Sequence, residues 1–271
     1  MIEKSCWPIV YTVGNGHPIV AVVGSVHGDE QVGRRIVEKL RDIQLTQGTF
    51  IGIVANPCAL ERHTRFIDTD LNRSFPGNES GTLEEQMAYH LGETLKQADY
   101  ILDVHSTTTD TRDVAIIKNR TEKVRTLVRK LSPRRVVLVP HGMGDGSLIN
   151  SFDGAVSLEY GPHEDEYTYM SSFNGVMRVL AKFNMIASAM TESGEVTEYF
   201  EVYGTVNRPD GFKMKLGIHN LVLCKKGETL GEIGDEQVYA EESFYPFLFG
   251  PESYKNIMGF KARKVDEMWK N

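Results

Sequence analysis

The side chains best suited to bind a metal ion stand near the amino terminus, where His27 and Glu30 lie three residues apart. An imidazole and a carboxylate at this spacing can share one divalent ion, and zinc accepts both kinds of ligand. Farther along the chain, His105 offers a second imidazole. Two histidines and one carboxylate leave a fourth position of the ion open to water, as catalytic zinc sites do and structural ones do not. These residues therefore predict one catalytic Zn2+ per chain.

A buried strand followed by a helix is expected to position the first two ligands. Residues 19–23 form an uninterrupted apolar run, which is typical of a strand buried on both faces. Apolar residues then recur at helical spacing from Val32, so we expect a helix to begin at or near Glu30. His27 and Glu30 therefore lie at a corner beyond the carboxyl end of a strand, where open α/β sheets have their binding sites.

The third ligand is expected at the end of a second strand. Residues 99–104 read as this strand, and His105 lies at its carboxyl end. Asp103 is on the same strand face as His105, because alternate residues of a strand share a face. Asp103 either orients a ligand imidazole by a hydrogen bond or is simply a polar residue at the end of the strand.

Strands and helices alternate through the first part of the chain, and short strands dominate the remainder. Further strands are predicted over 50–54, 114–117, 136–139 and 155–158, and helices over 82–95, 124–131 and 169–183. Residues 61–77 have neither period and are expected to form a long, ordered, functional loop. Beyond about residue 195, short strands are predicted over 199–206, 221–224, 229–233 and 245–249. We predict an α/β catalytic domain over residues 1–195 and a β-rich domain over residues 196–271.

Composition narrows the class of protein. The chain has 271 residues and a net charge of −7, which argues against nonspecific binding to nucleic acid. No apolar run approaches the roughly 20 residues that a membrane span needs, and the first residues contain no signal-peptide core. The three cysteines, Cys6, Cys58 and Cys224, form no C-x-x-C pair. We therefore expect free thiols in a reducing cytoplasm. From the net charge and the lack of a long apolar run, we expect no nucleic-acid or membrane partner.

Five motifs resemble, in order, those of the succinylglutamate desuccinylase/aspartoacylase family, which is related to the zinc carboxypeptidases. They are H-G-D-E at 27–30, R-F-I-D-T-D-L-N-R at 65–73, D-V-H-S-T at 103–107, L-E-Y-G-P at 158–162, and Tyr245-Pro246 followed by Tyr254. The resemblance implies a zinc carboxypeptidase-like α/β/α sandwich with a mixed central sheet and a small C-terminal β domain. It also implies that His27, Glu30 and His105 are the zinc ligands.

The same resemblance implies roles for other residues. Glu159 would be the general base, accepting a proton from water and passing it to the leaving amine. Arg65 would stabilise the negative oxygen of the tetrahedral state. Asn72, Arg73 and Tyr254 would bind a substrate carboxylate, for which arginine has a matching two-pronged geometry. Asp68 and Asp70 would position the arginines.

These observations predict a zinc amidohydrolase that cleaves a small N-acyl amino acid into a carboxylate and a free amino acid. Two alternatives are a metallocarboxypeptidase acting on small peptides and a non-catalytic binding protein with the same fold. Aspartoacylases carry an arginine about ten residues before the catalytic glutamate, and residues 147–151 contain none. That side of the pocket is therefore expected to prefer an apolar or neutral group. The acyl group, the amino acid and the oligomeric state, a homo-oligomer included, are left open.

Overall fold

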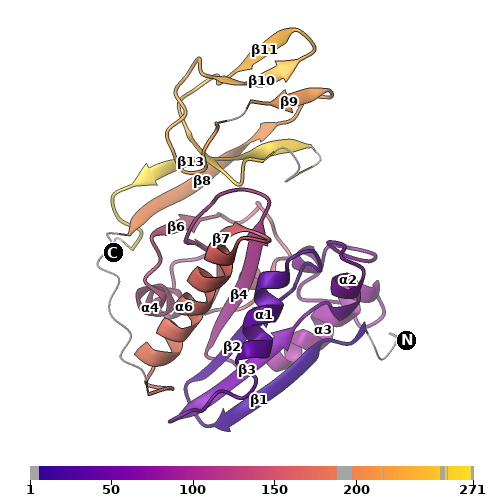
Figure 1. Cartoon of the computed structure of the whole chain (residues 1–271), viewed down its shortest axis with the longest axis vertical. Coiled ribbons are helices and arrows are strands. Elements are labelled where there is room, and N and C mark those ends of the chain that lie inside the picture. The colour runs from indigo at the N-terminus through magenta and orange to yellow at the C-terminus, as the bar shows by residue number, and fades with distance from the viewer. Residues whose placement is uncertain (1–5, 188–196, 216, 251–253, 255, 270–271) are drawn as a thin grey trace.

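A mixed ten-stranded sheet lies at the centre of the protein (Figure 1). The structure is a computed structural model, and it describes residues 6–187, 197–215, 217–250, 254 and 256–269. The strand order in this sheet is β1-β3-β2-β4-β7-β5-β6-β8-β13-β12. The bounds of its strands are β1 Ile9–Asn15, β2 Ile19–Gly24, β3 Gly48–Val54, β4 Tyr100–Thr107, β5 Val114–Ile117, β6 Arg135–Leu138, β7 Ala155–Pro162, β8 Glu198–Asn207, β12 Tyr245–Phe247 and β13 Ile257–Val265.

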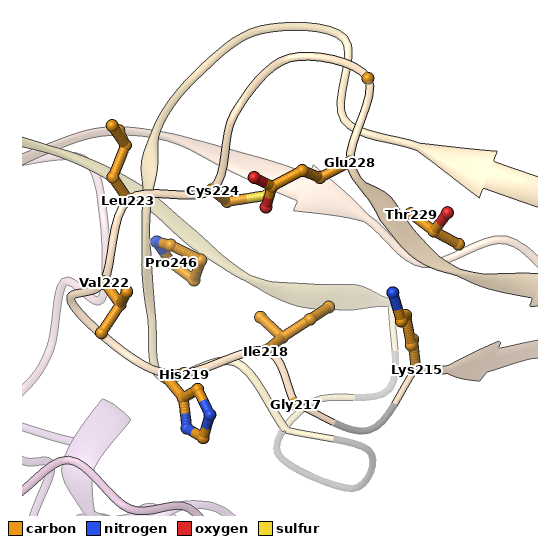
Figure 2. A pocket seen from close by; sticks show the side chains of 11 residues that line it. Lys215, Gly217, Ile218, His219, Val222, Leu223, Cys224, Glu228, Thr229 and Pro246 are labelled. Atoms are coloured by element: carbon orange, nitrogen blue, oxygen red, sulfur yellow. The ribbon is translucent and has the colours of Figure 1, made fainter.

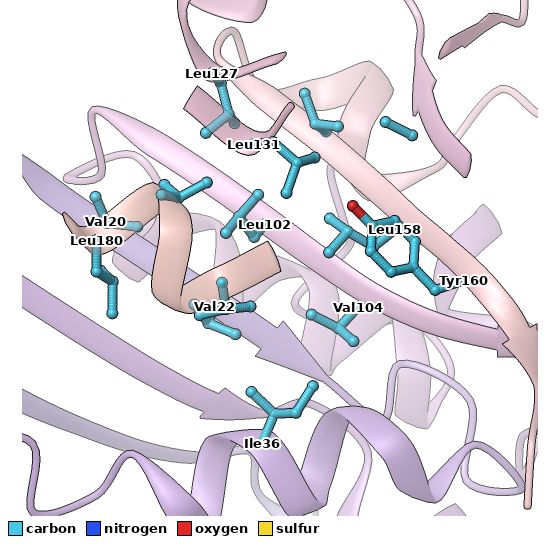
Figure 3. Close-up of a cluster of buried hydrophobic side chains, with 14 of the residues drawn as sticks. Val20, Val22, Ile36, Leu102, Val104, Leu127, Leu131, Leu158, Tyr160 and Leu180 are labelled. Carbon is cyan, nitrogen blue, oxygen red and sulfur yellow. The ribbon is translucent and has the colours of Figure 1, made fainter. Parts of the chain in front are cut away.

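Helices cover both faces of this sheet. Along β2, alternate side chains face opposite ways, as the strand period requires. Val20 and Val22 join a core that includes Ile36 and Leu180 (Figure 3), whereas Ala21 belongs to a second core. The first core packs under α1 (Gln31–Lys39), α4 (Glu122–Leu131) and α6 (Glu166–Lys182), and the second packs under α3 (Leu83–Leu95). Short helical segments are α2 (Pro57–Glu61), η2 (Leu71–Arg73) and α5 (Leu148–Ser151).

A small three-stranded antiparallel sheet stands apart from the central one, at the top of Figure 1. It consists of β9 (Phe212–Met214), β10 (Thr229–Ile233) and β11 (Glu236–Tyr239), and it has its own apolar cluster around Phe212 and Phe249. The predicted class, an α/β/α sandwich with a mixed central sheet and a small β unit, is confirmed. The predicted division between residues 195 and 196 lies at the edge of residues 188–196, outside the described residues, and stays a prediction.

The carboxy-terminal strands extend the central sheet rather than forming a sheet wholly of their own. Strand β8 pairs in parallel with β6, with Val137 opposite Phe200, and β13 pairs antiparallel with β8. This arrangement brings residues from beyond 196 against the amino-terminal α/β part of the chain. The predicted strand over 221–224 is wrong, since only an isolated bridge from Cys224 to Phe244 forms there.

Several strands escaped the sequence analysis because exposed or charged side chains weaken their apolar alternation. Strand β1 lies at the edge of the sheet, where it pairs with β3, and Ile9 and Val10 are exposed. Its inward side chains, Tyr11 and Val13, are only partly buried against the core, so its alternation is a weak signal. Strand β13 carries three cations in its sequence, and these pair with carboxylates of neighbouring segments instead of packing in the core.

The prediction of three free thiols is wrong for two of them. Cys6 and Cys58 form a disulfide with a Cα–Cα distance of 4.8 Å, and Cys224 is a free, buried cysteine. The pair is separated by 52 residues, so no local spacing in the sequence indicated it. The disulfide also removes the argument from free thiols for a cytoplasmic location. Among the described helices, none is long and apolar enough to cross a membrane.

Candidate metal centre and substrate pocket

Three neighbouring parallel strands bring the predicted ligands and the predicted base together. The order is β2, β4, β7, with Gly24 opposite Val104 and His105 opposite Glu159. Strand β4 continues to Thr107, so His105 lies within the strand rather than beyond its end. Glu159 likewise lies within β7, one strand away from His105.

Two glycines let helix α1 rest directly on this part of the sheet. A Cβ atom on Gly33 would lie 2.5 Å from the Cα of Gly24 and 2.9 Å from the carbonyl oxygen of Val104. Only the absence of a side chain permits this approach of helix and strand backbones. Glu30 precedes the first residue of α1, and its carbonyl accepts a hydrogen bond of 3.0 Å from Ser25 Oγ. The close packing of α1 therefore fixes Glu30 close to His27, in the turn after β2, and to His105 in β4.

The carboxylate of Glu30 lies between the two imidazoles. Its Oε1 is 2.7 Å from His27 Nδ1, and its Oε2 is 2.9 Å from His105 Nδ1. All three side chains are buried, and their candidate ligand atoms lie within 4.8 Å of one another. The far nitrogen of each imidazole also has a carboxylate, with His27 Nε2 3.0 Å from Asp70 Oδ1 and His105 Nε2 2.9 Å from Asp103 Oδ2.

This donor set fits a zinc ion. A zinc-bound histidine usually donates its other ring N–H to a carboxylate or carbonyl, which fixes the tautomer, and both histidines have such a partner. Of the two readings of Asp103, the contact with His105 favours the orienting one. Three carboxylates surround two imidazoles here, so negative charge is in excess and a bound cation would be stabilised.

The electrostatics of the cluster point the same way. Burial opposes ionisation of Glu30, but the two imidazoles outweigh it and hold the pKa of this carboxyl well below its usual range. Burial also favours neutral imidazole, but the surrounding carboxylates outweigh it and raise the pKa of His105 well above its ordinary value. The surrounding carboxylates thus favour positive charge at the imidazoles, and a divalent cation bound to the same nitrogen lone pairs would supply that charge in place of protons.

Glu159 has the environment of a general base. Its Oε2 is buried, and among the described residues it has no hydrogen-bond partner. Burial raises the pKa of Glu159 to about 8. A carboxylate whose pKa lies near neutrality can both accept and return a proton, whereas an ordinary glutamate is too weak a base.

The predicted long loop carries the arginines and is held by a buried carboxylate that the sequence analysis missed. Glu84, in α3, accepts hydrogen bonds from the backbone N–H groups of residues 67, 68 and 69 at 2.7–3.1 Å and from Asn56 Nδ2 at 3.2 Å. Its side chain is fully buried. No pattern in the sequence indicated this role, because Glu84 lies in the first turn of a helix, where acidic residues are common.

The two aspartates of this loop have different partners. Asp70 Oδ2 lies 3.3 Å from Arg65 Nη2, while Oδ1 accepts from the backbone N–H of Asn72 at 2.8 Å. Asp70 therefore orients both Arg65 and the segment that carries Asn72, as expected. Asp68 instead accepts from the backbone N–H of Leu83 at 3.2 Å, at the start of α3. Its expected contact with an arginine is not among the interactions of the described residues.

Two cavities meet at the candidate metal centre, and His27, Arg65, Glu159 and Tyr254 line both of them. One, of about 100 Å3, is also lined by Asn72, Arg73, Lys118 and mostly apolar side chains. The other, of about 130 Å3, is also lined by Glu30 and the polar residues Ser106, Thr107, Thr108 and His163. Tyr254 reaches the centre from the carboxy-terminal part of the chain. The structure thus gathers the predicted ligands, base and substrate-binding residues in one region.

A further cavity, of about 390 Å3, lies in the carboxy-terminal β region and contains none of the predicted site residues (Figure 2). Cys224 and Glu228 lie side by side in its wall. Burial and the nearby Glu228 raise the pKa of the Cys224 thiol. A thiol of raised pKa stays protonated at neutral pH and is a poor nucleophile, so we do not assign the chemistry to this cavity.

Comparison with known proteins agrees with the motifs. Residues 17–162, more than half of the chain, match the sequence model of the succinylglutamate desuccinylase/aspartoacylase catalytic domain. An N-acyl-aromatic-L-amino acid amidohydrolase (carboxylate-forming) from Rattus norvegicus is 25% identical over 91% of this chain and 90% of its own length. A probable aspartoacylase from Trichodesmium erythraeum is 29% identical over 53% of this chain and 55% of its own.

Solved structures share the fold. A succinylglutamate desuccinylase/aspartoacylase from Rhodobacter sphaeroides superposes with a TM-score of 0.77 at 18% identity, covering 95% of this chain and 89% of the other. Murine aminoacylase 3 superposes with a TM-score of 0.76 at 22% identity, covering 93% and 97%. At these identities the superpositions establish the architecture, and the site must be argued from the residues themselves.

Proposed function

Because the chain belongs to the succinylglutamate desuccinylase/aspartoacylase family, we propose that it is a zinc-dependent amidohydrolase that cleaves a small N-acyl amino acid into a carboxylate and a free amino acid. The names of its relatives support hydrolysis of the amide bond in N-acyl amino acids. The observation that carries the proposal is the buried His27–Glu30–His105 cluster beside a carboxylate oxygen of Glu159 that has no hydrogen-bond partner in the part of the chain that the structure describes.

In this proposal His27 Nδ1, Glu30 and His105 Nδ1 hold the zinc ion, with Asp70 and Asp103 fixing the imidazole orientations. A bound zinc ion supplies Lewis-acid polarisation and lowers the pKa of a coordinated water to about 7. Glu159 accepts a proton from the attacking water and delivers it to the leaving amine nitrogen. A non-catalytic binding protein would have no use for a buried base of this kind.

The remaining residues bind and stabilise the substrate. Arg65, half-exposed and oriented by Asp70, faces both cavities and stabilises the oxygen that gains negative charge. Asn72, Arg73 and Tyr254 line the cavity of about 100 Å3 and bind the carboxylate next to the scissile amide. Tyr254 stays a neutral hydrogen-bond donor, since burial raises its pKa above the ordinary value for a phenol.

The test measures zinc content and hydrolysis on the same samples. The purified protein should contain one zinc ion per chain, lose activity toward a panel of N-acyl amino acids with a chelator, and regain it with zinc. His105→Ala should lose the bound zinc, while the exposed His141→Ala, as control, should keep it. Stoichiometric zinc in His105→Ala would contradict the ligand assignment. Faster cleavage of short peptides than of acetylated amino acids would favour the carboxypeptidase alternative.

A further inference from the structure

A small polar cavity lies across the central sheet from the candidate metal centre. Glu159 and Tyr160 are consecutive residues of β7, so their side chains point to opposite faces of the sheet. Glu159 lines the two cavities at the candidate metal centre, whereas Tyr160 belongs to the core under α4 and α6, together with Leu131 (Figure 3). Tyr160 also lines a cavity of about 120 Å3, which shares none of its described lining residues with the other two.

The hydroxyl group of Tyr160 is a donor that no described residue satisfies. Tyr160 is 2% exposed, and its Oη has no hydrogen-bond partner in the described part of the chain. Burial raises the pKa of Tyr160 above its ordinary value, so the phenol stays protonated at neutral pH. Its oxygen lies against α6, where a Cβ atom on Gly175 would be 3.3 Å away. A buried hydroxyl without a partner is costly, so this one favours a polar molecule in the cavity.

Arg178 brings a second donor to the same cavity. Ser171, Asn174 and Arg178 line it from α6, at spacings of three and four residues that place them on one helix face. Arg178 Nη1 donates to the carbonyl oxygen of Leu131 at 2.7 Å, which holds the guanidinium group in place. Its Nε is buried and, among the described residues, has no acceptor. A fixed positive charge with an N–H group left over suits a carboxylate.

The cavity also contains a negative charge, on Asp113 directly before β5. Asp113 Oδ2 accepts a hydrogen bond from Tyr167 Oη at 3.0 Å. Asp113 raises the pKa of Tyr160 and Arg178 lowers it, so both charges lie near the phenol. Arg134, which is exposed, adds a further cation to the wall. A simple anion would be repelled by Asp113, whereas a ligand that carries both a carboxylate and an ammonium group matches both charges.

We propose that this cavity binds a small free amino acid, with its carboxylate on Tyr160 Oη and Arg178 Nε and its ammonium group on Asp113. A water molecule occupies about 30 Å3, so a volume of about 120 Å3 admits glycine or alanine but not a long side chain. The inference goes beyond the proposed amidohydrolase function. A free amino acid is one product of that reaction, but binding in this cavity does not require the reaction.

The competing explanation is that ordered water fills the cavity and satisfies both donors. Three variants separate the two. Tyr160→Phe removes only a hydroxyl that has no partner among the described residues, so this variant should fold. Arg178→Gln removes the positive charge. Arg129→Gln is the matched control, because Arg129 is an exposed arginine of α4 that does not line the cavity.

The experiment follows the ring of Tyr160 by NMR in the zinc-loaded full chain, with tyrosine isotope-labelled at Cζ. The Tyr160 signal is the one that Tyr160→Phe lacks. Glycine and alanine should shift it saturably. Acetate, which lacks the ammonium group, and leucine, which is too large, should leave it nearly in place. Arg178→Gln should raise the Kd for glycine about tenfold to a hundredfold, the range for a lost charged hydrogen bond, and Arg129→Gln should not change it.

A Tyr160 signal that glycine and alanine leave in place would overturn the proposal, and so would equal shifts with acetate or leucine. Equal affinity for glycine in Arg178→Gln and Arg129→Gln would also overturn it. If Arg178→Gln does not fold, Asp113→Asn decides, because it should abolish the preference for glycine over acetate, and an unchanged preference contradicts the proposal. The NMR signal needs no turnover, so the site can be confirmed in a protein that hydrolyses no N-acyl amino acid and refuted in an active enzyme.

Discussion

Replacing Glu84 by glutamine should loosen the arginine-bearing loop without touching a metal ligand. Glu84 is fully buried and accepts four hydrogen bonds, three of them from consecutive backbone N–H groups of residues 67–69. Oε1 accepts from Ile67 and Asn56, and Oε2 accepts from Asp68 and Thr69. Glutamine has nearly the same shape, but one of its two terminal atoms is an NH2 group that can accept none of these bonds.

The expected cost follows from this geometry. Whichever way the amide turns, two donors lose their acceptor, and each donor left without its acceptor costs about 1–3 kcal/mol. Glu84→Gln should therefore lower the free energy of unfolding by about 2–6 kcal/mol, a large part of the 5–15 kcal/mol typical of a protein. Because the loop carries Arg65, Asn72 and Arg73, kcat/KM should also fall, through both kcat and KM.

Urea unfolding followed by circular dichroism measures the stability, and Glu93→Gln is the matched control. Glu93 lies near the end of the same helix, is 64% exposed and pairs only with the exposed Lys96, so its replacement should change little. If Glu84→Gln unfolds at the same urea concentration as Glu93→Gln, the hydrogen bonds of Glu84 do not hold the loop. If it is destabilised but fully active, the loop does not position the substrate-binding residues.

Gly33→Ala should lower the free energy of unfolding by about 1–3 kcal/mol, because its methyl group would meet Gly24 Cα at 2.5 Å. Gly92→Ala in α3 should raise the free energy of unfolding by about 0.5–1 kcal/mol, because the added methyl group would lie 3.9 Å from Pro76 O, an ordinary contact. If urea unfolding shows that both alanine variants are stabilised or both destabilised, the packing argument is refuted. Glu159→Gln should keep its zinc while turnover falls at least about a hundredfold, and near-normal turnover would assign the base role to another carboxylate. Arg73→Ala should lower kcat/KM for a free N-acyl amino acid about tenfold or more and barely change that for its methyl ester, whereas equal losses would place the carboxylate elsewhere. Denatured, unreduced protein should titrate one thiol and reduced protein three, and three thiols before reduction would contradict the Cys6–Cys58 bond.

The sequence was most informative where chemistry and periodicity coincide. The run at 19–23 and the helical spacing after Glu30 predicted β2 and α1, and the structure has them at Ile19–Gly24 and Gln31–Lys39. The capping pair Thr82 and Glu85 likewise marked the start of α3, and both reciprocal hydrogen bonds are present. These features are local, so a short stretch of sequence contains all the residues that determine them.

Features that depend on strand order could not be predicted in the same way. The sequence did not predict that Lys118, just after β5, lines the cavity of about 100 Å3, because nothing in it showed that β5 lies antiparallel beside β7. The edge strand β1 buries its alternate apolar side chains only in part, and the Cys6–Cys58 bond joins segments 52 residues apart. Each of these depends on which distant segments become neighbours, and only the assembled sheet decides that.

The residues proposed to bind the metal and those proposed to bind the substrate lie on different segments of the chain. The proposed metal ligands and the proposed base belong to β4, β7 and the β2–α1 corner, where strand pairing and the Gly24–Gly33 contact fix the backbone. The groups proposed to bind the substrate come from the loop held by Glu84 and from Tyr254 in the carboxy-terminal part. This loop also meets the ligands, because the N–H of Gly28 donates to the carbonyl of Arg65 at 3.2 Å and Asp70 Oδ1 lies 3.0 Å from His27 Nε2. Substitutions confined to Arg73 or Tyr254 should alter substrate preference while zinc stays bound. Substitutions at the β2–α1 corner should lower metal affinity and activity together.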